Sequence, residues 1–372
     1  MIPLFTSEGA FATMRIKHSP VSCAIVVILT VVFCVSSYHG SLSATGGLAT
    51  HPTLPAGNDG QTETREEASD GSPLPWQPLT AIIGTRQRHK VAIGETLLDI
   101  ARLYDLGYNE LEDLYPSVDP WRLPEGAEMT IPARKILPDP VVRGIVINVP
   151  EMRLYYYDFI GDRPMVMTFP IGIGATDFPT PVGSFAVTSK RVHPTWFIPP
   201  SLQAKYRGIT SVPPGPNNPL GDYWMRLGDS MYGIHSTNFP WSVGRMATHG
   251  CIRMYPEDME RFFPIVQPGT RIQLVYQPVK VAVIDGRIHI EVHHDVYGKK
   301  GDLRRYSQTL LIDKGLAGRV DRRRLDRAIR EHTGMPVEIT LVSAPSTPSM
   351  RSPATGKIRV KPLEFVHPRS AD

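Results

Sequence analysis

The sequence predicts a mainly β protein, with a small α/β module before its largest domain and a small subdomain after it. Three observations support this fold class. The 372 residues are 41% apolar and 20% charged, which suits a globular chain of two or three packed domains. Between residues 141 and 277, short runs rich in β-branched and aromatic residues alternate with Gly, Pro, Asp and Asn. Before them, residues 72–138 show helical spacing between two strand-like runs.

The first 40 residues have the pattern of an export leader. Residues 21–35 (VSCAIVVILTVVFCV) are uncharged and apolar, and basic residues precede them. The run is shorter than the ~20 residues of a spanning helix, and its basic flank is N-terminal. We therefore predict a signal peptide over 1–40, with a retained membrane anchor as the alternative. Residues 41–71, rich in Ser, Thr, Gly and Pro, are predicted to form a flexible linker.

The module at residues 72–138 has a strand, helix, helix, strand pattern. A short strand at HKVA turns at Ile93-Gly94 into a helix whose apolar residues keep helical spacing. A second helix is expected at 109–114 and a closing strand at 128–131.

Residues 139–278 are predicted to form the main β domain. Its strand-like runs are GIVINVP, MRLYYYDF, PMVMTFPIGIG, GSFAVTSK, MYGIHST and TRIQLVYQ. Their regular spacing favours a sandwich or barrel over a doubly wound sheet. One short helix is expected from Pro256, with Met259, Phe262 and Phe263 as its buried stripe.

The C-terminal part is predicted to contain a subdomain at 279–343 and a tail. VKVAVIDGRIHIEVHHDV alternates around an Asp-Gly turn, which is typical of a hairpin. A basic helix near 322–331 and a strand at VEITLVS follow. Residues 344–372 are rich in Pro and Ser with scattered basic residues, which predicts a disordered tail.

The cysteine count singles out one residue. The chain has three cysteines, and Cys23 and Cys34 lie inside the predicted leader. Cys251 would then be the only thiol of the mature protein. A lone cysteine in an oxidising compartment cannot form an internal disulfide, so it is either a reactive thiol or a buried, inert one.

The stretch THGCIRMYP around Cys251 favours the reactive thiol. If the backbone is extended there, His249, Cys251 and Arg253 project from one face. A free thiol is only a few per cent ionised at pH 7, so an imidazole that takes its proton would make it a competent nucleophile. Gly250 would allow close approach of a substrate, the amide of Cys251 could donate to an oxyanion, and the arginine suits a substrate carboxylate.

Other functions fit less well. A zinc site needs a third or fourth protein ligand beside a His-x-Cys pair, and the remaining candidates, His235, His293 and His294, are scattered. We expect the last two to be surface or edge residues. A papain-like peptidase would place its cysteine before its histidine, whereas the candidate base His235 comes first here. The net charge is only +4, and no basic block is interleaved with aromatic residues, so nucleic acid is not an expected partner.

The segment GIHSTNFPWSVGRMATHGCIRM, residues 233–254, resembles the signature of the L,D-transpeptidases of the YkuD fold. That signature is a His, a spacer of about a dozen residues, then Ser/Thr-His-Gly-Cys and a polar residue two positions on. PTPVGSFAV and NVPEMRLYYY are similar to segments of exported Gram-negative members. Residues 72–138 resemble the LysM glycan-binding module through GETLLDIA and MTIP. The resemblance implies a YkuD-type β-sandwich catalytic domain, a LysM-like N-terminal module and a location in the periplasm, with anchoring in the inner membrane as the alternative.

The resemblance also implies roles for six residues and no metal or cofactor. They are Cys251 as nucleophile, His235 as general base, Ser236 as the carbonyl that orients the base, His249 and Arg253 as the lining of the donor pocket, and Gly250 as part of the oxyanion hole with Cys251. Two positions depart from the family pattern. Ser236 replaces a common Gly, and Arg253 stands where part of the family has Asn.

The implied reaction is an acyl transfer on peptidoglycan, whose peptide stems and glycan are the expected partners. Cys251 attacks the carbonyl that joins the third residue of a tetrapeptide stem to D-alanine, and D-alanine leaves. A second stem as acceptor gives a 3→3 crosslink, a lysine of an outer-membrane lipoprotein gives an attached lipoprotein, and water makes the enzyme a carboxypeptidase. A non-catalytic wall-binding protein is the alternative of a different class.

Overall fold

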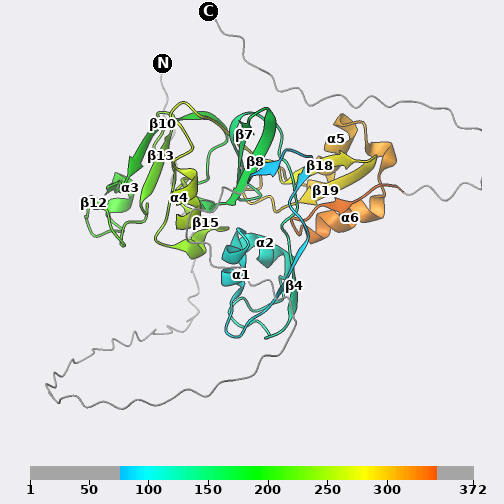
Figure 1. Ribbon diagram of the computed structural model, residues 1–372, viewed down its shortest axis with the longest axis horizontal. Coiled ribbons are helices and arrows are strands. Elements are labelled where there is room, and N and C mark those ends of the chain that lie inside the picture. The colour runs from blue at the N-terminus through cyan, green and yellow to red at the C-terminus, as the bar shows by residue number, and fades with distance from the viewer. Residues whose placement is uncertain (1–75, 342–372) are drawn as a thin grey trace, which may run out of the picture. The chain divides into compact units, whose positions relative to one another are not determined.

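The computed structural model describes residues 76–341 (Figure 1). All described residues belong to one compact unit of the chain. The predicted leader, linker and tail lie outside the described residues, as do Cys23 and Cys34. No helix within residues 76–341 is long and apolar enough to cross a bilayer.

The N-terminal module has the predicted strand, helix, helix, strand order. Its elements are β3 (Gln87–Lys90), α1 (Leu97–Leu103), α2 (Tyr108–Leu114) and β4 (Glu128–Ile131), and β3 pairs antiparallel with β4. α1 begins in a capping box, in which the Thr96 side chain accepts from the Asp99 backbone and the Asp99 side chain accepts from the Thr96 backbone. Leu97, Ile100 and Leu111 are buried in the core of the module. Short strands flank it: β1 (Gln77–Pro78), β2 (Ile82–Ile83) and β5 (Lys135–Ile136).

A nine-stranded mixed sheet forms the centre of the main β domain. Its strand order is β1-β8-β7-β6-β17-β10-β13-β14-β16. The strands other than β1 are β6 (Gly144–Asn148), β7 (Arg153–Ile160), β8 (Arg163–Pro170), β10 (Gly183–Val192), β13 (Tyr223–Leu227), β14 (Gly233–His235), β16 (Ile252–Arg253) and β17 (Arg271–Val275). Two pairs, β6 with β17 and β14 with β16, are parallel. All six strand-like runs of the sequence coincide with strands of this sheet.

This sheet curls around one apolar core. Buried residues of β6 and β7, such as Ile147 and Leu154, share a cluster with Ile234 of β14 and Ile252 of β16. The helix α4 (Pro256–Phe262) contributes Met259 and Phe262 to the same cluster. A single sheet whose distant strands contact one core has to bend around it, so the domain is a curled mixed sheet. The strand spacing had suggested a sandwich or a barrel, and the family resemblance a β-sandwich. The observed sheet is a single curled one, and the spacing could not reveal the two parallel pairings that join its strands.

Smaller elements lie in the long connections of this domain. They are β9 (Ile173–Gly174), β11 (Trp196–Phe197), α3 (Pro200–Gln203), β12 (Ser211–Val212), the 3-10 helix η1 (Pro240–Ser242) and β15 (Met246–Thr248). β9 pairs with β15, and β11 pairs with β12. The connections therefore carry short ladders of their own outside the main sheet.

The C-terminal subdomain confirms the predicted hairpin and basic helix. β18 (Val279–Ile284) and β19 (Arg287–Val292) pair antiparallel around Asp285 and Gly286, both at positive φ, and β20 (Val337–Glu338) adds a third strand. α6 (Arg322–Glu331) lies where the basic helix was expected, whereas α5 (Leu303–Asp313) and the 3-10 helix η2 (Ala317–Arg319) were not predicted. Both α-helices contribute buried leucines to a core with β19.

Candidate active site

Two neighbouring parallel strands place the predicted base and nucleophile on one face. β14 pairs with β16 so that His235 lies opposite Arg253 and Ile234 opposite Ile252. Cys251 directly precedes β16, and the backbone of Gly233 forms a hydrogen bond with its thiol. Because side chains two residues apart share a face of a strand, the thiol lies on the same side of the sheet as the guanidinium and the imidazole.

His235 is held as a neutral imidazole of defined tautomer. Its side chain is buried, Nδ1 lies 2.5 Å from the Ser236 carbonyl oxygen, and the Trp224 ring stacks on it with centroids 5.6 Å apart. A carbonyl only accepts, so the neutral ring carries its proton on Nδ1 and leaves Nε2 unprotonated. Burial first, and then the charge of Arg253, lower the pKa of His235 to about 3, against the opposing effect of the Ser236 and Leu220 backbones.

Cys251 is partly buried and its thiol is protonated at neutral pH. Burial raises the pKa of Cys251, and the Gly233 backbone and the charge of Arg253 oppose that rise. Within the described residues no hydrogen bond joins Cys251 Sγ to the His235 ring. Such contacts are often long before a substrate is bound and tighten in the complex. The thiol therefore depends on a base for its activation.

Thr248 shapes the turn that presents Cys251. Its Oγ1 accepts from the Gly250 amide at 3.1 Å and donates to the Cys251 carbonyl at 2.6 Å. Gly250 has φ of 101°, and a Cβ there would overlap the Tyr232 ring, so only glycine fits. The Gly250 amide is thus occupied, whereas the Cys251 amide has no partner among residues 76–341. Of the two amides expected in the oxyanion hole, only that of Cys251 is available.

The backbone is not extended through His249, as the sequence had suggested. It bends at His249 and Gly250, so that β15 and β16 belong to different sheets. His249 is exposed, and its ring lies against Phe178 with centroids 4.6 Å apart. Burial, followed by the charges of Lys205 and Arg253, lowers the pKa of His249. His249 therefore lies at the mouth of the site and within electrostatic range of Arg253.

Arg253 offers an unsatisfied cationic donor to this site. Its backbone is fixed by two hydrogen bonds with Gly172, at 2.8 and 3.0 Å. Its Nε is buried without a hydrogen-bond partner. Burial lowers the pKa of Arg253, and Cys251 and Tyr206 oppose that effect. A partly buried guanidinium whose Nε lacks a partner is suited to bind an anionic group of a ligand.

Three residues that the sequence did not single out support the turn. Thr180 Oγ1 accepts from the Gly174 amide at 2.8 Å and donates to the Gly250 carbonyl at 3.1 Å. Tyr297 of the C-terminal subdomain accepts from the Thr180 amide and donates to the Gly174 carbonyl. With Thr248, these residues tie the nucleophile turn to two other parts of the chain. Both threonines lie inside motifs quoted above, but no sequence pattern indicated Tyr297.

The connection from His193 to Asp222 forms one wall of the site. It carries Lys205 and Tyr206, whose charges influence His249 and Arg253. Asn218 is fully buried, and its side-chain amide donates to the Pro194 carbonyl at 2.7 Å and to the carbonyls of Val212 and Pro213. This asparagine joins both ends of the connection.

His293 and His294, which were considered as zinc ligands, lie in ionic contacts with carboxylates. Donor atoms of Glu151, Glu291 and His293 lie within 4.8 Å of one another, all buried. Lys280 Nζ stands 2.7 Å from each of the two carboxylates, so an ammonium group already occupies the position of a cation. The expectation of a surface position was wrong for His293, which is buried against Glu291, whereas His294 is half-exposed and pairs with Asp113.

Comparisons with known proteins agree on one family. Residues 142–281 match the YkuD family, described as the L,D-transpeptidase catalytic domain. The chain is 35% identical to the "Probable L,D-transpeptidase YbiS" of Escherichia coli K12 over 72% of this chain and 91% of that protein. It is 36% identical to the "Probable L,D-transpeptidase ErfK/SrfK" of the same strain, over 73% and 89% of the two chains. The solved catalytic domain of the E. faecium L,D-transpeptidase is 23% identical over 37% of this chain and 100% of that chain, with a TM-score of 0.29. The chain therefore belongs to the L,D-transpeptidase family, and residues 142–281 are its catalytic domain.

Proposed function

We propose that this L,D-transpeptidase acts on peptidoglycan, with Cys251 as nucleophile and His235 as general base. Nε2 of His235 takes the thiol proton, and the sulfur bonds to the carbonyl carbon between the third stem residue and D-alanine. The carbon–nitrogen bond then breaks, and the imidazolium returns the proton to the departing amine of D-alanine. In the second step the neutral His235 takes a proton from the acceptor as the acceptor attacks the thioester carbon. The carbon–sulfur bond breaks, and the imidazolium returns the proton to the departing sulfur, which restores the thiol.

The neutral His235 is the observation that carries this proposal. With Nδ1 held by the Ser236 carbonyl, and with burial and the charge of Arg253 lowering the pKa of the ring, Nε2 carries no proton at neutral pH and its lone pair is available to the thiol. A wall-binding protein without catalysis has no need of such a base on the same sheet face as its only described thiol. The carbonyl of Ser236 takes the place of the third group that orients the base in other triads.

The remaining predicted residues have supporting roles in this proposal. The free amide of Cys251 donates to the developing oxyanion, and Gly250 supplies the tight turn rather than a second donor. Arg253 binds a carboxylate of the stem through its unpartnered Nε. His249, exposed beside Phe178, lines the entrance for the donor stem.

The wider organisation belongs to the same proposal. The module at residues 72–138 acts as a LysM-like glycan-binding unit; its strand, helix, helix, strand order supports this assignment. Residues 139–278 form the catalytic domain and 279–343 a subdomain that steadies it through Tyr297. The enzyme works in the periplasm, and the acceptor is either the amine of a second stem or a lysine of an outer-membrane lipoprotein.

Mass spectrometry on the intact protein tests the proposal. After incubation with a carbapenem, whose strained acyl carbon resembles the scissile carbonyl, the drug mass should appear on one peptide that contains Cys251. With muropeptides, wild type should release D-alanine. Cys251→Ser should neither form the carbapenem adduct nor release D-alanine. An adduct on a serine, or D-alanine release by Cys251→Ser, would reject the nucleophile. Crosslinked dimers indicate an amine acceptor, and free tripeptide indicates water.

A further inference from the structure

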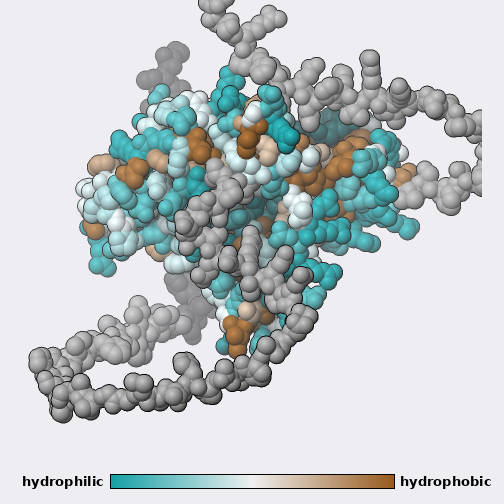
Figure 2. All heavy atoms as spheres, in the orientation of Figure 1, coloured by the Kyte–Doolittle hydropathy of each residue, from teal (hydrophilic) through white to brown (hydrophobic). Residues whose placement is uncertain are grey.

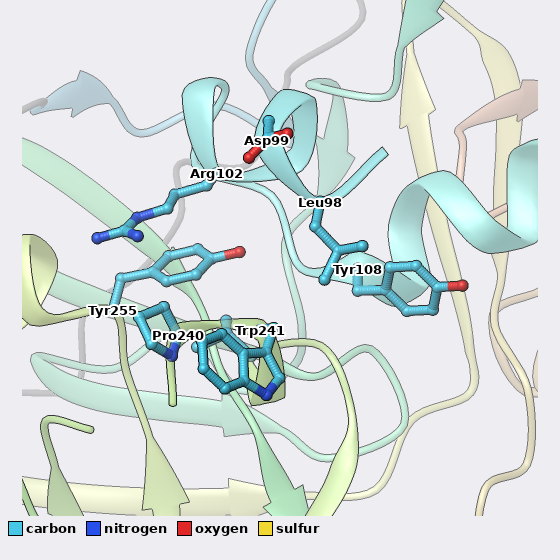
Figure 3. Close-up of a pocket in the computed structure, with 8 residues that line it drawn as sticks. Leu98, Asp99, Arg102, Tyr108, Pro240, Trp241 and Tyr255 are labelled. Atoms are coloured by element: carbon cyan, nitrogen blue, oxygen red, sulfur yellow. The ribbon is translucent and has the colours of Figure 1, made fainter. Parts of the chain in front are cut away.

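A small pit lies between the N-terminal module and the connection that joins His235 to Cys251. Its volume is about 90 Å³. Figure 3 shows its lining: Leu98, Asp99 and Arg102 on α1 face Tyr255, Pro240 and Trp241 of the catalytic domain, and Tyr108 closes one side. The inner lining is apolar, and Asp99 and Arg102 are exposed at the rim.

Trp241 makes an exposed aromatic surface beside this pit. Its side chain is 57% exposed, and it packs edge-to-face on Phe239, itself 42% exposed, with ring centroids 5.4 Å apart. Figure 2 shows a mostly hydrophilic surface with hydrophobic residues in small separate groups. An exposed tryptophan that packs on a second aromatic ring offers a fixed apolar face on which a ligand can stack.

The rim of the pit supplies hydrogen bonds that are already oriented. Arg102 donates through Nε and one terminal nitrogen to the two carboxylate oxygens of Glu257, at 2.6 and 2.8 Å. This pair uses two of the five N–H donors of the guanidinium and holds its plane in place. The side chain of Asp99 uses Oδ2 in the capping box and is exposed at the rim. Donors and acceptors therefore stand next to an apolar hollow and an aromatic face.

We propose that the pit and Trp241 form a subsite for an N-acetylated sugar of the glycan strand whose peptide stem occupies the Cys251 site. This inference rests on the proposed function. A pyranose ring has an apolar C–H face that can cover the indole and hydroxyl groups that suit the polar rim. The pit has room for only a few water-sized groups, so it accepts an acetamido methyl but not a whole ring.

The position of the subsite in the chain supports this occupant. Trp241 belongs to η1, in the connection that begins after His235 and ends before Cys251. A sugar bound there and a stem bound at the thiol would be held by one short segment, as the two ends of one ligand would be. The paired charges of Arg102 and Glu257 leave no excess positive charge at the rim, which disfavours an anionic lipid surface.

The test compares two substrates that share the scissile bond. D-alanine release is measured from the disaccharide-tetrapeptide and from the free tetrapeptide. Trp241→Ala should raise KM for the disaccharide substrate about tenfold, the loss of one aromatic contact of ~1.4 kcal/mol, and leave the free tetrapeptide unchanged. Leu98→Phe, which fills the pit, should do the same. Ile312→Ala, at an exposed apolar residue of α5 outside both the pit and the N-terminal module, should change neither substrate.

The outcomes separate the subsite from the chemistry. Equal effects on both substrates, no effect of Trp241→Ala, or the same loss in Ile312→Ala would overturn the sugar subsite while the enzyme remained active. A disaccharide substrate that lacks the acetyl groups should bind wild type more weakly and be insensitive to Leu98→Phe. If wild type released no D-alanine from either substrate, the proposed function itself would fail instead.

Discussion

At the scale of single residues, the buried His235 links the chemistry of the site to the stability of the fold. Its folded pKa of about 3 lies below the ordinary value of 6.5. Between these values the unfolded chain binds a proton that the folded protein does not, so stability falls as the pH decreases through that window. The same depressed pKa keeps Nε2 free to act as a base at neutral pH.

The first prediction follows from the direction of this pH dependence of stability. Between pH 7.5 and 5.5, wild type should lose about 1.4 kcal/mol more than His235→Gln, which cannot protonate there. Urea unfolding at the two pH values measures the difference. His249→Gln is the control, because His249 is exposed and should give a smaller effect. Parallel losses in wild type and His235→Gln would show that His235 does not titrate in this way.

Thr248 is a positioning residue whose hydroxyl can be tested separately from the thiol. Thr248→Val keeps the shape of the side chain but removes the bonds to the Gly250 amide and the Cys251 carbonyl. We expect a loss of about 1–3 kcal/mol in stability and acylation slowed about tenfold or more through kcat rather than KM. Thr248→Ser should restore most of both. Equal kcat in Thr248→Val and wild type would remove Thr248 from the site.

At the scale of elements, the sequence predicted those helices and strands that are determined by interactions between residues close together in the chain. Five of the six predicted strands and α6 were recognised because their pattern extends over several residues, and α4 because of Pro256 and its apolar stripe. The sixth, β14, has three residues and was found through the longer run MYGIHST around it. β13 was missed although it stacks Trp224 on His235. β15 and β16, of three and two residues, are too short for any pattern. The bend at Gly250 separates these two strands. It depends on contacts of Gly250 with Tyr232 and Thr248, and such contacts leave no periodic pattern in the sequence.

The connection over the site depends on one buried side chain. Asn218 has no exposed surface and donates to three carbonyls, and its Oδ1 accepts from the Leu220 amide. Asn218→Ala should leave the curled sheet folded but loosen residues 193–222, because those buried backbone groups lose their partner. We expect faster proteolysis within that segment and slower acylation of Cys251. Asn217→Ala, at an exposed neighbour, is the matched control and should behave as wild type.

At the scale of the described molecule, a buried ionic network joins its three parts. Glu110 of the N-terminal module pairs with Lys135 and with Arg153 of β7. A second group centres on Lys280, which contacts Glu151 and Glu291, with His293 bonded to Glu291. Three carboxylates thus face two lysines, one arginine and one histidine. No sequence pattern indicated this network, because its members lie up to 181 residues apart (Glu110 to Glu291) and no local spacing brings them together.

Lys280 is the residue through which this network can be tested. Lys280→Met keeps a long apolar side chain but leaves two buried carboxylates without their cation, which costs about 3–5 kcal/mol. Lys314→Met removes a partly exposed pair with Asp139 and should cost less than about 1 kcal/mol. Denaturant unfolding at pH 7 measures both changes, and equal costs in the two variants would show that the buried group contributes no more than a surface pair.

The pH dependence of Lys280→Met tests the electrostatic origin of that cost. Burial acts to raise the pKa of Glu291, but Lys280 and His293 outweigh it and lower the pKa to about 2, below the ordinary 4.5. A carboxyl with a depressed folded pKa stabilises the fold fully above 4.5, and this contribution is lost as the pH falls toward 2. The stability difference between wild type and Lys280→Met should therefore be largest above pH 5 and shrink toward pH 3. A difference that stayed constant over this range would mean that lost packing of the lysine stem, and not its charge, destabilises the variant.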